Sequence, residues 1–253
     1  MQKIRFLYDN WFDSAYLTLT ASTEDDNFPV SNIQHPWWTR HWRSTSKTGQ
    51  WVKWHFNWAR APKAFIMKGH NLSGGHIHLQ GNATDVWTAP TVDWAIDIEG
   101  DPVTYQDDTF PALEYWRVDL SSATSDDSYF KIGRIYSGQW WSPTYNFDYI
   151  YRKKLIDPSE KTYSTGLQMS ANVRQKLREV GYHFSFVTQA DMETLDEIFW
   201  DYVGLTVPYW ICQDYDEAAT TTMYVENIES WEFEHSTASL APWKLAVAVR
   251  ELA

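Results

Sequence analysis

The stretch Trp51-Val-Lys-Trp-His-Phe56 decides the fold class, because its apolar and polar side chains alternate. Val52, Trp54 and Phe56 fall on one face of an extended chain, which is the pattern of a half-buried β-strand. Short apolar or alternating segments recur through the first 145 residues, at 15–21, 64–68, 76–80, 95–99, 115–120 and 130–136. Clusters of Gly, Pro, Asn and Asp separate these segments. The sequence therefore predicts an all-β sandwich for the N-terminal part.

The pattern changes after Trp140-Trp141-Ser-Pro143, where a basic run and a turn-like segment follow. Further strands are predicted at 163–176, 177–187, 207–212, 223–228 and 243–250. One helix is predicted over Gln189–Val203, with Thr188 and Asp191 as a capping box and Gly204 as the stop. We therefore expect a mostly β protein, with a β-sandwich in residues 1–148 and a small β-domain in residues 149–253 that packs one helix, about 189–203.

Composition excludes several classes of protein. The chain has 253 residues, and its 33 acidic and 21 basic side chains give a net charge of −12, which argues against a nucleic-acid partner. No apolar run approaches the roughly 20 residues that a membrane span needs, and the first residues lack the apolar core of a signal peptide. The single cysteine, Cys212, lies in an apolar segment, where an inert buried thiol is expected. These features predict folding in a reducing cytoplasm.

Motifs for catalysis or metal binding are weak. There is no P-loop, no dinucleotide glycine fingerprint and no nucleophile elbow. His70, His76 and His78 lie close together in the sequence, and His76 and His78 share one face of a strand. No third ligand follows this pair at a spacing that is typical of a metal site. The acidic doublets 25–26, 107–108 and 126–127 lack an ordered series of calcium ligands. We therefore expect no enzyme, no metal and no cofactor. A carboxylate pair for glycoside hydrolysis stays open, because the sequence alone cannot select two of 33 acidic residues.

Aromatic residues make up 17% of the chain, with 16 Trp, 15 Tyr and 12 Phe. Exposed rings of this kind stack on sugars or anchor protein partners, whereas buried ones fill a core or a domain junction. Five tryptophans lie in loop-like segments and form the candidate partner-binding surface: Trp37, Trp38, Trp42, Trp140 and Trp141.

Four stretches, in order, give residues 1–145 a likeness to a known family: Asn27–Asn32 with Trp42-Arg-Ser44, Trp51–Phe56, Ile66–Leu72 with Ile77–Gly81, and Tyr129–Gly138. Together they resemble the galactose-binding-like (discoidin-type) β-sandwich. The version with a Gly69-His-Asn-Leu72 turn is similar to sandwiches in tail proteins of bacteriophages and prophages.

The second part is similar in outline to the small domain of phage distal-tail and baseplate proteins. The likeness rests on Gly181–Phe186, the following helix, Gly204-x-x-x-Pro-Tyr-Trp210 and the last strand from Trp243. Such proteins place the ring-forming domain first, whereas the sandwich precedes it here.

The resemblance implies a structural component of a phage or prophage tail tip or baseplate. It would form a trimer or hexamer ring between the tail tube and the hub or fibres, in the virion, after assembly in the host cytoplasm. The terminal strand, with Trp243, Leu245, Val247 and Val249, is the candidate edge for pairing between copies. The alternative is a carbohydrate-binding module that recognises host-surface polysaccharide through loop tryptophans.

Overall fold

The computed structural model describes residues 3–149, 151–235 and 242–252. The chain is mostly β and divides into two compact units. The sandwich unit comprises Asp9–Trp140 and Asp216–Thr222, and the helix unit comprises Met1–Tyr8, Trp141–Tyr215 and Met223–Ala253. No helix in the described residues is long and apolar enough to cross a membrane.

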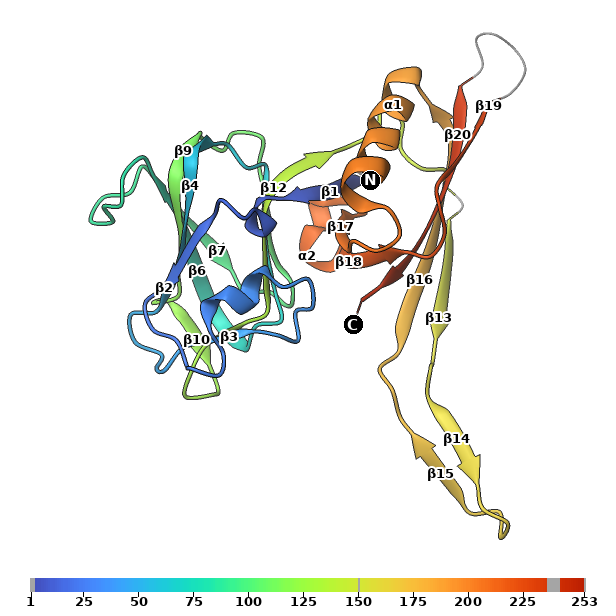
Figure 1. The fold of residues 1–253 in the computed structure, drawn as a ribbon, viewed down its shortest axis with the longest axis horizontal. Coiled ribbons are helices and arrows are strands. Elements are labelled where there is room, and N and C mark those ends of the chain that lie inside the picture. The colour runs from blue at the N-terminus through green and yellow to red at the C-terminus, as the bar shows by residue number, and fades with distance from the viewer. Residues whose placement is uncertain (1–2, 150, 236–241, 253) are drawn as a thin grey trace. The chain divides into compact units, whose positions relative to one another are not determined.

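The sandwich unit has two antiparallel layers (Figure 1). One sheet has the order β10-β6-β9-β4-β2 with β7 paired to β6, and its strands are β2 (Thr18–Ala21), β4 (Trp51–Arg60), β6 (Leu72–Asn82), β7 (Val92–Asp97), β9 (Leu113–Asp119) and β10 (Ala123–Ser125). The other layer has the order β12-β5-β8, with strands β5 (Ala64–Lys68), β8 (Val103–Gln106) and β12 (Arg134–Trp141). The short remaining elements are β3 (Trp42–Arg43), β11 (Lys131–Ile132), η1 (Trp11–Asp13), η2 (Val30–Gln34), η4 (Tyr215–Glu217) and α2 (Ala218–Thr221).

The core of the sandwich unit confirms the predicted inward face of the Trp51–Phe56 segment. Val52, Trp54 and Phe56 are buried, and Trp54 lies opposite Trp116 of β9 in the register. Trp54 also packs against Phe65 of the other layer, with ring centres 6.3 Å apart. This aromatic core fixes both sheets, because each large ring buries apolar area against several neighbours.

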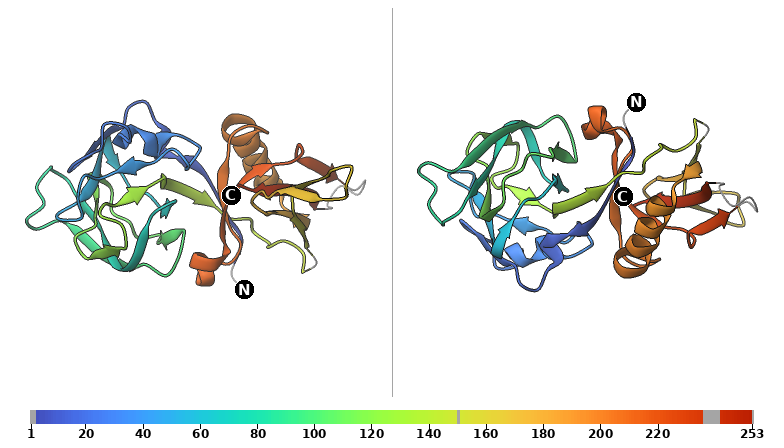
Figure 2. Two further views of the ribbon diagram at one scale, coloured as in Figure 1. Left: turned by 90° about the horizontal axis from the view of Figure 1, so that it is seen from below. Right: turned by 90° about the horizontal axis from the view of Figure 1, so that it is seen from above.

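The helix unit is a sheet in the order β13-β16-β20-β18-β17-β1, with β19 paired to β20. Its strands are β1 (Arg5–Asn10), β13 (Arg152–Ile156), β16 (Leu177–Val187), β17 (Tyr209–Cys212), β18 (Thr222–Asn227), β19 (Glu232–His235) and β20 (Trp243–Glu251). The helix α1 (Gln189–Glu197) continues as the π-helical segment η3 (Ile198–Val203) and covers one face of the sheet (Figure 2). The predicted capping box is confirmed, because Thr188 Oγ1 accepts from Asp191 N and the Asp191 carboxylate accepts from Thr188 N.

The predicted domain boundary differs from the observed one at the N-terminus. The sequence predicts that residues 1–148 form the sandwich, but β1 pairs with β17, with Arg5 opposite Cys212 and Leu7 opposite Trp210. Phe6 is fully buried in the core of the helix unit. A local pattern carries no information about the pairing partner of a strand, so the sequence predicts the wrong unit for β1. The sandwich is thus an insertion within the helix unit.

The terminal strand is not a free edge, which corrects its prediction as an oligomer edge. β20 pairs with β16 along one side and with β18 and β19 along the other. Leu245, Val247 and Val249 are buried in the core, and Trp243 Nε1 donates to Gln189 Oε1 at 2.8 Å. The alternating apolar residues show only that one face of the strand is covered, and the pairing on both sides shows that the strand is internal.

Candidate functional site

The sheet of β4, β9, β6 and β7 presents a face turned away from the core, which we call the outer face. Strand alternation places Lys53, Arg117, Gln80 and Asp93 on it, because the residues beside them in each strand point inward. The register aligns these four residues in one row across the sheet: Lys53 lies opposite Arg117, Arg117 opposite Gln80, and Gln80 opposite Asp93. A band of polar groups therefore crosses four strands.

Hydrogen bonds lock this row. The Arg117 guanidinium donates from Nε and Nη2 to Gln80 Oε1 at 2.9 and 2.5 Å. Gln80 Nε2 in turn donates to Asp93 Oδ2 at 3.1 Å, and Asp93 Oδ1 lies 2.7 Å from His78 Nδ1. Each side chain thus fixes the next, so the planar groups hold their orientation before any ligand arrives.

Aromatic rings lie next to this row. The Arg117 guanidinium lies 4.6 Å from the ring centre of Trp87, which comes from the loop between β6 and β7. Asp85 holds this loop to the face, because it accepts from Trp87 Nε1 at 2.7 Å and from Lys53 Nζ at 2.6 Å. In the neighbouring row, the Tyr115 ring stacks on His55 with centres 4.2 Å apart.

The charges of the face are set by this packing. Partial burial lowers the pKa of Arg117, while the carboxylates of Asp119, Asp93 and Asp85 act in the opposite direction. The hydrogen bond from Lys53 lowers the pKa of Asp85. The face therefore combines carboxylates, a guanidinium, an amide and flat rings. Such a surface can exchange hydrogen bonds with hydroxyl groups and pack against the C–H face of a ring.

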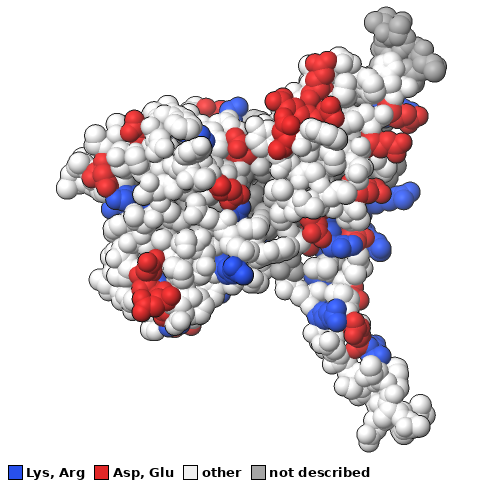
Figure 3. All heavy atoms as spheres, viewed as in Figure 1, with Lys and Arg blue, Asp and Glu red and all other residues white. Residues whose placement is uncertain are grey.

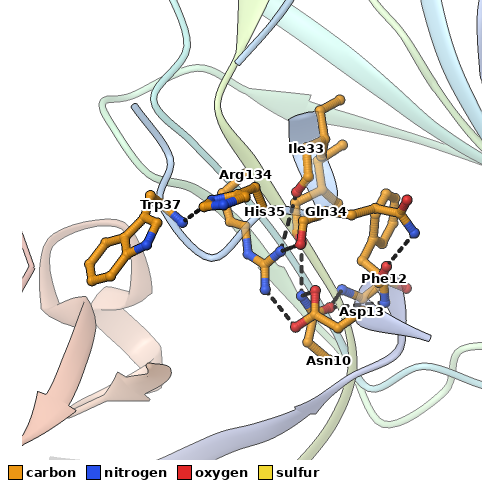
Figure 4. A network of polar contacts seen from close by, with 10 residues as sticks. Asn10, Phe12, Asp13, Ile33, Gln34, His35, Trp37 and Arg134 are labelled. Carbon is orange, nitrogen blue, oxygen red and sulfur yellow. Dashed lines mark hydrogen bonds and ion pairs between the residues drawn. The ribbon is translucent and has the colours of Figure 1, made fainter. Parts of the chain in front are cut away.

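Trp37 is exposed, as predicted for a partner-binding tryptophan, with 51% of its surface accessible. Its loop is held by Arg134, which donates to the Ile33 and Gln34 carbonyl oxygens and pairs with Asp13 at 2.6 Å (Figure 4). The Trp37 backbone N–H donates to His35 Nδ1, and the indole points away from the Arg134 cluster. The loop is rigidly anchored while the ring itself lies at the surface.

The other four predicted tryptophans are less exposed than Trp37. Trp42 is fully buried in the sandwich core, and its Nε1 donates to the Thr23 carbonyl at 3.0 Å, so it is a core residue. Trp38 is half-buried, with its ring edge against Gly69. Trp140 and Trp141 are half-buried neighbours on β12, where successive side chains point to opposite faces. Their adjacency in sequence gives no aromatic cluster.

The histidines and acidic doublets have structural partners. His78 pairs with Asp93, and the Asp107 carboxylate accepts from the Thr109 N–H and hydroxyl at 2.8 Å. Asp127 accepts from Asn71 Nδ2. In the described part of the chain no group of three or more His, Cys, Asp or Glu side chains converges in a way that could hold a metal ion. Cys212 is buried, as predicted.

Trp87 and Arg117 are central to the outer face but are not among the residues that the sequence predicts for a site. Arg117 falls on the polar side of the alternating 115–120 segment, and Lys53 on that of 51–56, so their shared outward direction was available from the pattern. The alignment of Arg117 and Lys53 in one row could not be predicted, because the register between distant strands is not a local property. Trp87 lies in a loop without any pattern.

No family model and no curated protein sequence matches the chain. Similar solved structures include a family 32 carbohydrate-binding module of Clostridium perfringens NanJ in complex with galactose, at 10% identity and a TM-score of 0.42, covering 54% of this chain and 99% of that one. A fucose-binding module of Streptococcus pneumoniae is similar at 8% identity and a TM-score of 0.42, covering 52% and 95%. A chitosan-binding module of Paenibacillus sp. IK-5 has 16% identity and a TM-score of 0.40, covering 51% and 98%. The assignment of the sandwich itself rests on the strand pairing of this chain.

Proposed function

We propose that the sandwich unit binds a saccharide on its outer face and that the chain is a recognition protein without catalytic activity. The observation that supports this is the locked row of Arg117, Gln80 and Asp93 beside the Trp87 ring. Sugars present hydroxyl groups that pair with planar donors and acceptors, and C–H faces that pack on aromatic rings. Groups that already hold their orientation lose little entropy on binding.

The carboxylates of the outer face favour binding over hydrolysis. A general acid for glycosidic cleavage needs a raised pKa, whereas the Lys53 contact lowers the pKa of Asp85. Asp93 accepts from Gln80 and contacts His78, and Asp119 Oδ2 lies 3.2 Å from Arg117 Nη2. Each carboxylate is thus committed to orienting a neighbour.

Titration of the full-length chain with a panel of mono- and oligosaccharides, followed by calorimetry, tests this proposal. Trp87→Ala should weaken binding about tenfold or more, as expected for a central aromatic contact. Trp58→Ala is the matched control, because Trp58 is also a sandwich tryptophan at the surface, with 50% of its surface accessible, and it packs on Arg60 instead. Absence of binding to every saccharide refutes the proposal. Loss of binding in Trp37→Ala with Trp87→Ala unaffected moves the site to the Trp37 loop.

A second candidate is a structural role in a phage tail tip, between tail tube and hub. The pairing of β1 with β17 favours it, because the strand that precedes the sandwich belongs to the helix unit. The sandwich is thus inserted into the helix unit, although most of that unit, residues 141–215 and 223–253, still follows the sandwich. Light scattering of the full-length chain, alone and with tail-tube and hub proteins from the same genome, tests this role. A chain that forms no complex with either protein refutes it.

A further inference from the structure

A long hairpin extends from the sheet of the helix unit, and we call residues 157–176 the arm (Figure 1). β13 pairs with β16 from Arg152 opposite Gly181 to Ile156 opposite Leu177. The arm continues this pair through β14 (Glu160–Tyr163) and β15 (Met169–Asn172), which pair only with each other in the described residues. Every residue from 160 to 176 is exposed. The predicted single strand over 163–176 is therefore wrong, because a turn at 164–168 reverses the chain.

The arm has one apolar face. Tyr163 lies directly opposite Met169, and Lys161 opposite Ala171, so these four side chains share a face of the ribbon. The other face carries only polar residues, Glu160, Thr162, Ser170 and Asn172. Leu167 at the tip and Val173 are 83% and 80% exposed. An isolated two-stranded ribbon is marginally stable in water, so an uncovered apolar face of this kind favours a partner.

The arm and its base are basic within an acidic protein. Residues 152–178 contain seven Lys or Arg and two Asp or Glu, whereas the rest of the chain contains 14 basic and 31 acidic residues. Arg152, Lys153, Lys161 and Lys176 form no ion pair in the part of the chain that is described. Lys161 and Lys176 act at longer range on the exposed Asp157 carboxylate, and with seven cations to two carboxylates the segment keeps a positive charge for an acidic surface.

A complementary surface lies on α1, η3 and the segment after them, residues 189–207, which contain five acidic residues and no basic residue. Acidic side chains gather over α1 (Figure 3), and Asp196, Glu197 and Asp201 are exposed. Trp200 is 81% exposed. Leu205 and Val207, which follow it closely in the sequence, are exposed as well. We call this the α1 surface. It offers the arm both opposite charge and apolar area.

The two surfaces cannot meet within one copy. The arm joins β16 at Leu177, and α1 follows the other end of the same strand at Val187. Eleven residues of strand separate these points, or about 35 Å at ~3.3 Å per residue. The arm also points away from α1 along this strand (Figure 1).

We propose that the arm of one copy packs on the α1 surface of a second copy of this chain. The basic arm fits the acidic surface, and Tyr163, Met169 and Leu167 fit the exposed Trp200 region. Because the two contact surfaces differ, the contact is head-to-tail and gives a closed ring when the rotation between copies closes. This deepens the assembly role proposed above and does not depend on saccharide binding.

The test uses two full-length variants whose changes are confined to exposed side chains. The arm variant is Lys161→Glu with Lys176→Glu, and the α1 variant is Asp196→Lys with Asp201→Lys. Each variant alone brings like charges together at the contact, which should weaken self-association on the order of 100-fold. An equal mixture restores opposite charges in every contact between unlike variants, so the two variants should associate with each other although neither associates with itself. Light scattering mass and sedimentation velocity measure this, and circular dichroism checks that each variant is folded.

Three outcomes decide the proposal. Assembly of the wild type and of the mixture, with both variants monomeric, supports it. A wild type that stays monomeric at high micromolar concentration and low salt overturns it. An oligomer that neither variant disturbs also overturns it and leaves assembly through another surface. Saccharide titration of the monomeric variants separates the two functions, because the outer face lies in the other unit.

Discussion

The outer face of the sandwich and the arm differ in how far their polar groups are already paired. On the outer face Arg117, Gln80 and Asp93 bond to each other across neighbouring strands. On the arm Lys161 and Lys176 form no ion pair in the described part of the chain, and Tyr163 lies exposed. A paired, rigid surface suits a small polar ligand, which needs fixed partners. A surface with unpaired charge and uncovered apolar side chains suits a macromolecular partner that neutralises and covers it.

The largest effect on the unfolding free energy is expected from a substitution in the core beneath the outer face. Trp116 is fully buried between Trp54 of the neighbouring strand and Phe110, and a Cβ at Gly81 would meet its ring at 2.9 Å. Trp116→Ala should lower the unfolding free energy of the sandwich by about 3–5 kcal/mol. Leu167→Ala on the arm is the control and should leave this transition unchanged. Differential scanning calorimetry measures both, and an unchanged Trp116→Ala transition contradicts the assigned core.

A smaller effect on the unfolding free energy is expected from removing a hydrogen-bond donor of the outer face. Arg117→Met keeps the apolar stem but leaves Gln80 Oε1 without its donor and Asp119 without its cation. The unfolding free energy should fall by about 1–2 kcal/mol, and saccharide binding should weaken together with it. Arg174→Met is the matched control, because Arg174 pairs with Glu160 at an exposed place on the arm. If the two substitutions lowered the unfolding free energy equally in urea, the hydrogen-bonded row of the outer face would stabilise the protein no more than an exposed ion pair of the arm. The contrast between the two surfaces would then be wrong.

The sequence predicts those features that depend on neighbouring residues. The inward face of Trp51–Phe56 and the helix that starts after Thr188 follow from periodicity and capping, and both are confirmed. Burial of Cys212 likewise follows from its apolar surroundings.

Features that depend on pairing between distant segments could not be predicted. The first strand pairs with β17, and the terminal strand β20 lies inside its sheet, although both segments have ordinary strand patterns. Trp42 and Trp37 look equivalent in sequence, yet one is in the core and the other at the surface. The row on the outer face exists only once the register of four strands is known.

The stability of the sandwich should also depend on pH through His70. Burial lowers the pKa of His70 below its ordinary value, although nearby Asp101 acts in the opposite direction. The ring is neutral in this arrangement, since the Leu72 N–H donates to Nδ1 and Nε2 lies 3.0 Å from the Gly100 carbonyl. The unfolded chain takes up a proton near pH ~6.5, whereas the folded chain does so only at lower pH.

The sign follows from proton uptake. Below pH ~6.5 the unfolded state binds more protons, so stability falls as pH decreases, until the folded His70 is protonated too. Urea midpoints of the sandwich transition from neutral pH to about pH 5 measure this slope, and His70→Gln should reduce it. His35→Gln is the comparison, because the pKa of His35 is also lowered, while its ring lies near the surface beside Arg40. A slope that His70→Gln leaves intact contradicts the assignment.

The smallest effect is expected on the arm, where two tyrosines of the helix unit make the comparison direct. Tyr182 is fully buried in the core, and Tyr163 is 63% exposed on the apolar face of the arm. In the monomeric α1 variant, Tyr163→Ala should change the unfolding free energy by less than about 0.5 kcal/mol, whereas Tyr182→Ala should lower it by about 3–5 kcal/mol. Chemical unfolding followed by tryptophan fluorescence measures both.

In the otherwise unchanged chain, Tyr163→Ala should instead weaken self-association, because the substitution removes a ring that packs on the second copy. If Tyr163→Ala lowered the stability of the monomer, the arm would pack on its own chain. The arm would then not differ from the outer face in having uncovered side chains.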